Sequence, residues 1–199
     1  MEFNLEKIYK VMREKEKLRE ELLSLTREIN RLCAKSTRRV HQGKIDDAKK
    51  LLEKALTLNK ELVRYREKLP EMYYSITYTC HQEIVEAFAL LRVIENKEFP
   101  APDEVDVEPE PYLTGLADLI GELRRYVLEL LKKKNLKEVE RILTVMEELF
   151  DELIIFDLPE KMIPGLRKKI DGARAIIDRT KSHYLMTLQM NEVVRKLER

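Results

Sequence analysis

The sequence contains few of the residues that mark disulfide-bonded, strand-rich or membrane proteins. Its 199 residues include five Gly, two Cys and no Trp. Cys33 and Cys80 are too few for a disulfide framework and lack the spacing of a zinc site, so both are expected to be reduced thiols. No apolar run approaches the ~20 residues that cross a membrane, and the N-terminus lacks the apolar segment of a signal peptide. We therefore expect a cytoplasmic protein without a membrane partner.

The chain also lacks a net charge of either sign. Lys and Arg number 38 and Asp and Glu number 37, although charged residues make up 38% of the chain. This balance gives no overall attraction to nucleic acid or to a membrane surface. Any site for nucleic acid must therefore be a local cluster of basic residues.

Apolar residues recur at helical spacing, and no segment shows the alternation of a strand. Leu18, Leu22, Leu25 and Ile29, for example, lie four and three residues apart and predict one buried stripe along a long helix. We predict an all-α fold, a single-domain antiparallel bundle of about six or seven helices over residues 1–199. The predicted helices cover residues 4–41, 45–68, 71–95, 112–133, 136–156 and 159–197, with a proline-rich acidic linker at 96–111.

The first predicted helix carries a basic face opposite its apolar stripe. The candidates for binding nucleic acid on this face are Arg27, Arg31, Lys35, Arg38 and Arg39. Bases outnumber acids between residues 31 and 44, which favours binding to the phosphates of nucleic acid. The alternative is a solvated helix face on which these bases pair with neighbouring Glu side chains.

Two later segments each carry two acids on one helix face. Glu83 and Glu86 are three residues apart and Asp118 and Glu122 are four apart, so the members of each pair are neighbours on a helix surface. On its own helix only Glu122 has a base within reach, Arg125. The surrounding residues are apolar, and desolvating an unpaired charge is costly. These acids are therefore expected to find partners elsewhere in the fold.

Three kinds of partner would satisfy such acids. They are arginines such as Arg124 or Arg174, protons that neutralise the carboxylates, or a hard divalent cation held by oxygen ligands. Gly115 and Gly121 would let two helices approach closely enough for carboxylates from both to share an ion. A ligand set without His or Cys suits Mg²⁺ or Mn²⁺. Such ions support phosphodiester hydrolysis, because they activate water and neutralise charge on the phosphate.

Three stretches of the sequence resemble the translin family. They are Tyr112–Leu123, with the sequence Tyr-Leu-Thr-Gly-Leu-Ala-Asp-Leu-Ile-Gly-Glu-Leu, then Gln82–Ala87, with Gln-Glu-Ile-Val-Glu-Ala, and Leu166–Gly172, with Leu-Arg-Lys-Lys-Ile-Asp-Gly. The first two are similar to the branch of the family typified by translin-associated factor X. The chain shows no basic N-terminal extension of the kind that targets eukaryotic members to nuclei. It therefore resembles a prokaryotic or archaeal member.

The resemblance implies both an assembly and an activity. Members of this family are all-helical, assemble as hollow octamers and bind single-stranded RNA or DNA. In the branch of translin-associated factor X they supply a Mg²⁺-dependent endoribonuclease activity. The four acids of that active site correspond to Glu83, Glu86, Asp118 and Glu122 here, which the resemblance thus implies to be both catalytic residues and metal ligands.

We therefore expect a Mg²⁺-dependent endoribonuclease that acts on single-stranded RNA within a hollow homo-oligomer. His41 and His81 are the nearest candidates for a proton donor, although a lone His is more often structural. Two alternatives remain: a translin-like protein that binds single-stranded RNA or DNA without cutting it, and a helical scaffold whose acids pair with arginines. Cleavage of RNA in Mg²⁺ and binding of RNA in EDTA separate the three.

Overall fold

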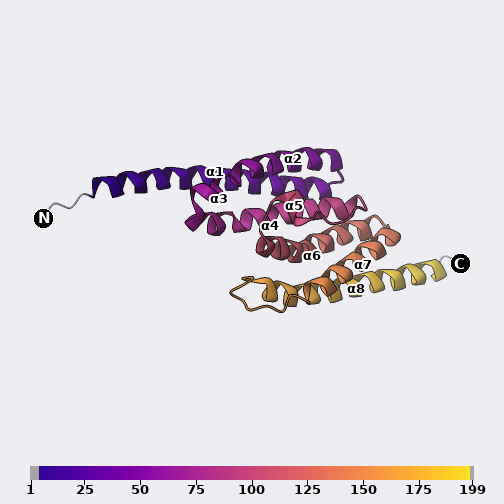
Figure 1. Ribbon diagram of the computed structural model, residues 1–199. Coiled ribbons are helices and arrows are strands. Elements are labelled where there is room, and N and C mark those ends of the chain that lie inside the picture. Colours follow the sequence, from indigo (N-terminus) through magenta and orange to yellow (C-terminus); the bar gives the residue numbers. More distant parts are fainter. Residues whose placement is uncertain (1–4, 198–199) are drawn as a thin grey trace.

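The structure, a computed structural model, describes residues 5–197 and is built from helices (Figure 1). They are α1 (Glu6–His41), α2 (Ile45–Leu62), α3 (Tyr65–Lys68), α4 (Pro70–Ile94), α5 (Pro102–Val105), α6 (Pro109–Lys132), α7 (Leu136–Leu153) and α8 (Leu166–Leu197). Six of them have 18 residues or more, while α3 and α5 are single turns of four residues. No strand occurs between residues 5 and 197. The prediction of an all-α fold is confirmed.

Helix α1 begins the bundle and ends at a turn that the sequence marks clearly. Gly43 has a φ of +74°, which is accessible to Gly because it has no Cβ. Its N–H donates to the carbonyl of Val40 at 2.9 Å, and the N–H of Lys44 donates to the carbonyl of Arg39 at 2.9 Å. These two bonds satisfy carbonyls that the end of the helix leaves free. The chain then reverses, and α2 packs antiparallel along α1 (Figure 1).

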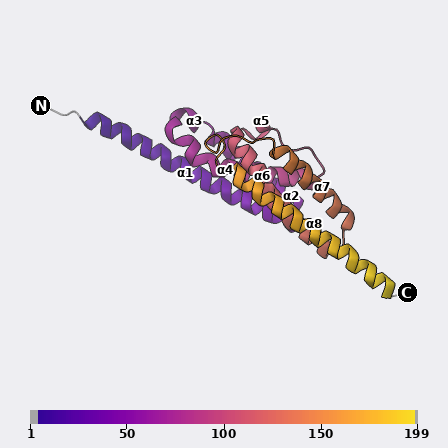
Figure 2. The ribbon, with the colours of Figure 1, turned by 90° about the horizontal axis from the view of Figure 1, so that it is seen from below.

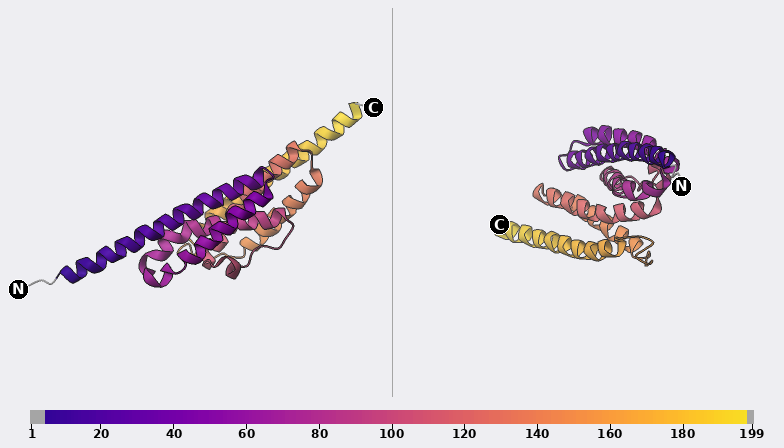
Figure 3. Two further views of the ribbon diagram at one scale, coloured as in Figure 1. Left: turned by 90° about the horizontal axis from the view of Figure 1, so that it is seen from above. Right: turned by 90° about the vertical axis from the view of Figure 1, so that its left-hand side faces the viewer.

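The long helices are stacked in layers. Helices α1 and α2 form one side, α4 lies beneath them, α6 follows, and α8 forms the opposite side (Figure 1 and the right-hand view of Figure 3). Helices α1, α4, α6 and α8 run in the same direction in Figure 1, whereas α2 and α7 run back. The segment that contains α5 returns the chain between α4 and α6. The N-terminal part of α1 and the C-terminal part of α8 project from opposite ends (Figure 2).

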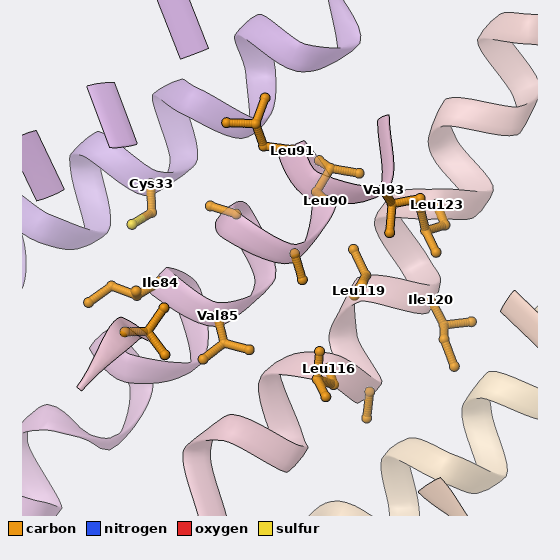
Figure 4. Packing of buried hydrophobic residues seen from close by; sticks show 14 of the residues in the cluster. Cys33, Ile84, Val85, Leu90, Leu91, Val93, Leu116, Leu119, Ile120 and Leu123 are labelled. Carbon is orange, nitrogen blue, oxygen red and sulfur yellow. The ribbon is translucent and has the colours of Figure 1, made fainter. Parts of the chain in front are cut away.

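Helix α4 occupies the centre of the fold, as its nearly continuous apolar surface predicts. It packs against α1 and α2 on one side and against α6 on the other. Ile84 and Leu90 of α4 are completely buried, as are Leu119 and Leu123 of α6. Figure 4 shows Leu119 between the two helices and Ile84 on the side of α4 that faces away from α6. None of the helices in residues 5–197 is both long and apolar enough to cross a membrane.

Two boundaries differ from the prediction because prolines act differently at the two sites. Residues 96–111 were expected to be extended, but α5 lies within them and α6 begins at Pro109 instead of residue 112. Pro109 and Pro111 fall in the first turn of α6, where backbone N–H groups have no partner in the helix anyway. The last helix, expected from residue 159, begins at Leu166 because Pro164 and Gly165, with φ +83°, interrupt it.

Two other helices are shorter than expected. The helix predicted over 45–68 stops at Leu62, and after a turn the single-turn helix α3 follows. The helix predicted over 136–156 ends at Leu153. Ile154, Ile155 and Phe156 are exposed, so no core holds these apolar side chains in the helical register. Both differences reflect tertiary packing, which local propensity does not encode.

Candidate acidic site and basic helix face

The two acid pairs face each other across the contact between α4 and α6. Glu83 and Glu86 lie on α4, and Asp118 and Glu122 lie on α6. The two helices approach closely at Gly115, where an added Cβ would lie 2.8 Å from the carbonyl oxygen of Gln82. This contact is within one helical turn of an acid on each helix. The structure thus brings together the two faces that the sequence placed on separate helices.

The prediction that Gly115 and Gly121 let two helices approach closely is confirmed for Gly115 and wrong for Gly121. Gly115 does allow the close approach, since a Cβ there would also lie 2.9 Å from Cβ of Val85. Gly121 does not contribute to it, because an added Cβ would have no atom within 4 Å. Only one glycine of the pair therefore lies at the helix–helix contact.

The four carboxylates share one electrostatic environment. Burial raises the pKa of Glu86 to about 8, and the charges of Glu83, Asp118 and Glu122 add to this effect. The pKa of Glu83 is raised as well, first by burial and then by Asp118 and Glu122. Within residues 5–197, neither Glu83 nor Glu86 forms an ion pair. In this arrangement Glu86 therefore holds a proton at neutral pH.

Two side chains from distant parts of the chain pair with the acids of α6. Nζ of Lys169, on α8, donates to both carboxylate oxygens of Asp118, at 2.6 and 2.5 Å. Nε2 of His41, at the end of α1, is hydrogen-bonded to Glu122, and this bond lowers the pKa of that carboxyl. Arg125 lies 3.8 Å from Glu122. The acids of α6 thus have partners on three different helices, α1, α6 and α8.

The arginines considered as partners for the acids lie elsewhere. Arg124 donates to the hydroxyl of Thr180 at 2.9 Å, and the guanidinium of Arg174 stacks 5.4 Å from the ring centroid of Phe150. Lys169 is the functional residue that sequence reasoning missed. It is 51 residues from Asp118 in the chain, so no local spacing could link them.

The two histidines have separate environments. His41 touches the acidic site through Glu122. His81 is fully buried, and its Nδ1 lies 2.9 Å from Glu108, which also pairs with Arg66 at 2.8 Å. His81 therefore belongs to a structural network at the start of α6, and only His41 remains a candidate proton donor.

The chemistry of the donor set fits a hard divalent cation, since all four ligand candidates are carboxylates. Glu86 is partly buried without a cationic partner in the described part of the chain, which also fits a divalent cation, because the charge of such an ion would stabilise the ionised carboxylate. The side chains are nevertheless arranged for ion pairing: in residues 5–197 no three His, Cys, Asp or Glu side chains are grouped as a metal site. Lys169 and His41 each engage one of the acids.

The basic face of α1 leads to this acidic site. Arg27, Arg31, Lys35 and Arg38 are exposed, and Arg39 is half-buried. Four of these side chains, at positions 27, 35, 38 and 39, form no ion pair within residues 5–197, whereas Arg31 pairs with Glu28. At 100° per residue, His41 lies on the edge of the same face, about 60° from Arg38. The free bases therefore line a path that ends beside Glu122.

The fold and the site together define an all-helical protein with four carboxylates between two central helices and a basic helix face beside them. The chain belongs to the translin family, whose model matches residues 5–184. An uncharacterized protein of Methanocaldococcus jannaschii is 35% identical over 190 residues, which cover 92% of this chain and 84% of that protein.

Three solved structures are similar over nearly the whole chain. The structure of AfC3PO in complex with duplex RNA has a TM-score of 0.89 and 40% identity. The crystal structure of AfC3PO has a TM-score of 0.89 and 39% identity, and that of apo-NeC3PO has 0.86 and 26%. Each comparison covers 94% of this chain and 98% of the other.

The raised pKa of Glu86 predicts a specific pH dependence of stability. The folded protein holds a proton on Glu86 up to about pH 8, while the unfolded chain loses it near pH 4.5. The contribution of Glu86 to the free energy of unfolding is fully present below pH 4.5 and is lost as the pH rises through 8. Glutamine at this position does not titrate, so the free energy of unfolding of Glu86→Gln minus that of the parent protein should increase by about 2 to 4 kcal/mol as the pH rises from about 5 to about 9.

Urea unfolding in EDTA at several pH values measures this difference. The exposed Glu148, on α7, provides the control, and Glu148→Gln should keep the pH dependence of the parent protein. If Glu86→Gln followed the same pH dependence as the parent, Glu86 would not be a buried proton-holding acid.

Proposed function

We propose that this protein is a Mg²⁺-dependent endoribonuclease that acts on single-stranded RNA within a hollow homo-oligomer in the cytoplasm. The observation that carries the proposal is the cluster of four carboxylates from α4 and α6 at the end of a basic helix face. Membership of the translin family supports it, and the similar AfC3PO has been determined in complex with duplex RNA. We extend RNA as the ligand class to this chain.

Each group of residues has a distinct role in the proposed reaction. Glu83, Glu86, Asp118 and Glu122 would hold Mg²⁺, or Mn²⁺ in its place. The bound ion would activate a water molecule and neutralise charge on the scissile phosphate. One carboxylate of the cluster would also orient the attacking water. His41, hydrogen-bonded to Glu122, is placed to hold or deliver a proton at its Nε2.

The proposed homo-oligomer is supported by apolar side chains at the projecting end of α8. Leu185, Met186, Met190, Val193 and Val194 are at least half exposed. Contiguous apolar surface of this kind usually marks a protein contact. Eight subunits are proposed from the family resemblance.

One observation favours a second function, the binding of single-stranded RNA or DNA without cleavage. Lys169 and His41 already pair with two of the four acids, and the ammonium of Lys169 offsets part of their charge without a metal. A protein of this kind would bind RNA through α1 equally well in Mg²⁺ and in EDTA. A helical scaffold would bind no RNA under either condition.

Incubation with end-labelled single-stranded RNA separates these functions. The endoribonuclease should produce internal cleavage in Mg²⁺ and none in EDTA. A duplex of the same sequence and the corresponding single-stranded DNA test the substrate class in parallel. Intact RNA under both conditions, with retained binding, would contradict the nuclease and leave the binding protein.

RNA binding by the basic face should depend strongly on salt. Each phosphate contact of a single strand contributes a slope of about −0.7 to log K against log salt. The double variant Lys35→Gln/Arg38→Gln should bind RNA more weakly and lower the magnitude of that slope by about 1.4, because two contacts are lost. Fluorescence anisotropy in EDTA, at KCl concentrations from about 50 to about 300 mM, measures both the affinity and its dependence on salt.

The control is Lys60→Gln, which removes an exposed base from the last turn of α2. It should leave both the affinity and the slope unchanged. Equal losses in Lys60→Gln and in the double variant would indicate nonspecific attraction to the whole surface rather than binding along α1.

A further inference from the structure

The ammonium of Lys169 contacts the acidic site, and Lys169 comes from a helix that carries none of the four acids. It lies in the first turn of α8, where its N–H donates to the carbonyl of Gly165 at 3.1 Å. Its ammonium contacts both oxygens of Asp118, at 2.6 and 2.5 Å. Both side chains are about one third exposed, so the pair lies at the mouth of the site rather than in the core.

The charge of Lys169 reaches beyond Asp118. It lowers the pKa of Glu83 and of Glu86, against the larger effects of burial and of the neighbouring acids. One ammonium therefore acts on carboxylates of both α4 and α6. A divalent cation bound between the two helices would act on the same groups.

We infer that Lys169 is an internal counter-ion of the acidic site, which occupies Asp118 in the metal-free protein and is displaced when a divalent metal binds. This inference rests on the proposed metal site. The ammonium of Lys169 lies within hydrogen-bond distance of both oxygens of Asp118, so a metal ion that bound both oxygens would have to take its place. The flexible four-carbon stem of Lys lets the ammonium leave without movement of the backbone.

The charges of the site explain why a metal can displace Lys169. Four carboxylates face one ammonium and one histidine, and Glu83 and Glu86 form no ion pair within residues 5–197. A divalent cation supplies twice the charge of Lys169 and takes several oxygen ligands at once. Lys169 thus reduces the repulsion among the four carboxylates when no metal is bound, and it sets the metal concentration at which the site fills.

The test measures metal binding through thermal stability, without RNA and without activity. The melting temperature of the parent protein and of Lys169→Met is recorded in EDTA and then in increasing MgCl₂. In EDTA the variant should melt at a lower temperature, because Asp118 loses its counter-ion. MgCl₂ should raise the melting temperature of the variant more than that of the parent protein. The half-saturating concentration of MgCl₂ should be about tenfold lower for the variant, since no internal cation competes with Mg²⁺.

Lys168→Met is the matched control. It removes the same charge from the adjacent position of α8, but Lys168 is exposed and forms no ion pair within residues 5–197. It should titrate with MgCl₂ like the parent protein. If Lys169→Met does not fold, Lys169→Gln replaces it, and loss of the free Mn²⁺ signal in electron paramagnetic resonance provides a second, direct measure of binding.

The outcomes separate this inference from the proposed function. Tighter Mg²⁺ and Mn²⁺ binding in the Lys169 variant alone supports the inference. Equal metal binding in the parent and the variant leaves the metal site intact but overturns the role of Lys169, as does weaker binding in the variant, which would make Lys169 a support of the site. Absence of metal binding in every protein overturns both the metal site and the inference.

Discussion

Asp118→Ala and Glu122→Ala should each lower RNA cleavage in Mg²⁺ by at least ~100-fold, because each removes a proposed ligand from the ion that activates water. RNA binding along α1 should persist in both variants, since the basic face contributes its own phosphate contacts. Initial cleavage rates of end-labelled single-stranded RNA, with anisotropy in EDTA for binding, measure the two properties separately.

Both variants need a check on folding, because each leaves a side chain without its partner. Asp118→Ala frees Lys169, and Glu122→Ala frees the nearly buried His41. A melting temperature for each variant therefore accompanies the assay. Glu148→Ala, an exposed change on α7, should cleave at the parent rate. Cleavage that survives in EDTA, or in both α6 variants, would rule out the metal site.

Gly115→Ala should lower the free energy of unfolding by about 1 to 3 kcal/mol, the range for overpacking a close contact. The new Cβ would lie 2.8 Å from a backbone carbonyl oxygen, that of Gln82, and 2.9 Å from Cβ of Val85. Helices α4 and α6 would have to move apart to accommodate it. Urea unfolding measures the change in stability.

The same substitution at Gly121 is the control on the same helix. An added Cβ there meets no atom within 4 Å, so Gly121→Ala should be neutral or stabilise the helix by ~0.5–1 kcal/mol. Because α4 and α6 carry the four acids, Gly115→Ala should also reduce cleavage. Equal stability of the two variants would show that the contact at Gly115 is not a close packing point.

The arrangement of acids has a cost that the rest of the fold offsets. A raised pKa at Glu83 and Glu86 means that the folded protein disfavours their ionised forms. Surrounding apolar side chains, such as Ile84, Leu119 and Leu123, are completely buried and stabilise the same pair of helices. Strong packing next to unfavourable charge is typical of functional sites, where perturbed pKa values gather.

Local patterns predicted most of the helices but misplaced several of their ends. The Gly43 turn was readable because a left-handed residue after a helix strongly favours Gly. The start of α6 was not, because the same prolines that resist a helix interior are tolerated in a first turn. The end of α7 depends on whether Ile154 and its neighbours meet a core, which no local sequence states.

The sequence by itself determined that each acid pair lies on one helix face and that bases line one face of α1, since both follow from the helical repeat. Only the tertiary structure decided that the two acidic faces meet beside Gly115 and that Lys169 and His41 pair with them. The physical reason is distance along the chain. Lys169 and His41 lie 51 and 81 residues from their acids, and their pairing is set by how whole helices pack.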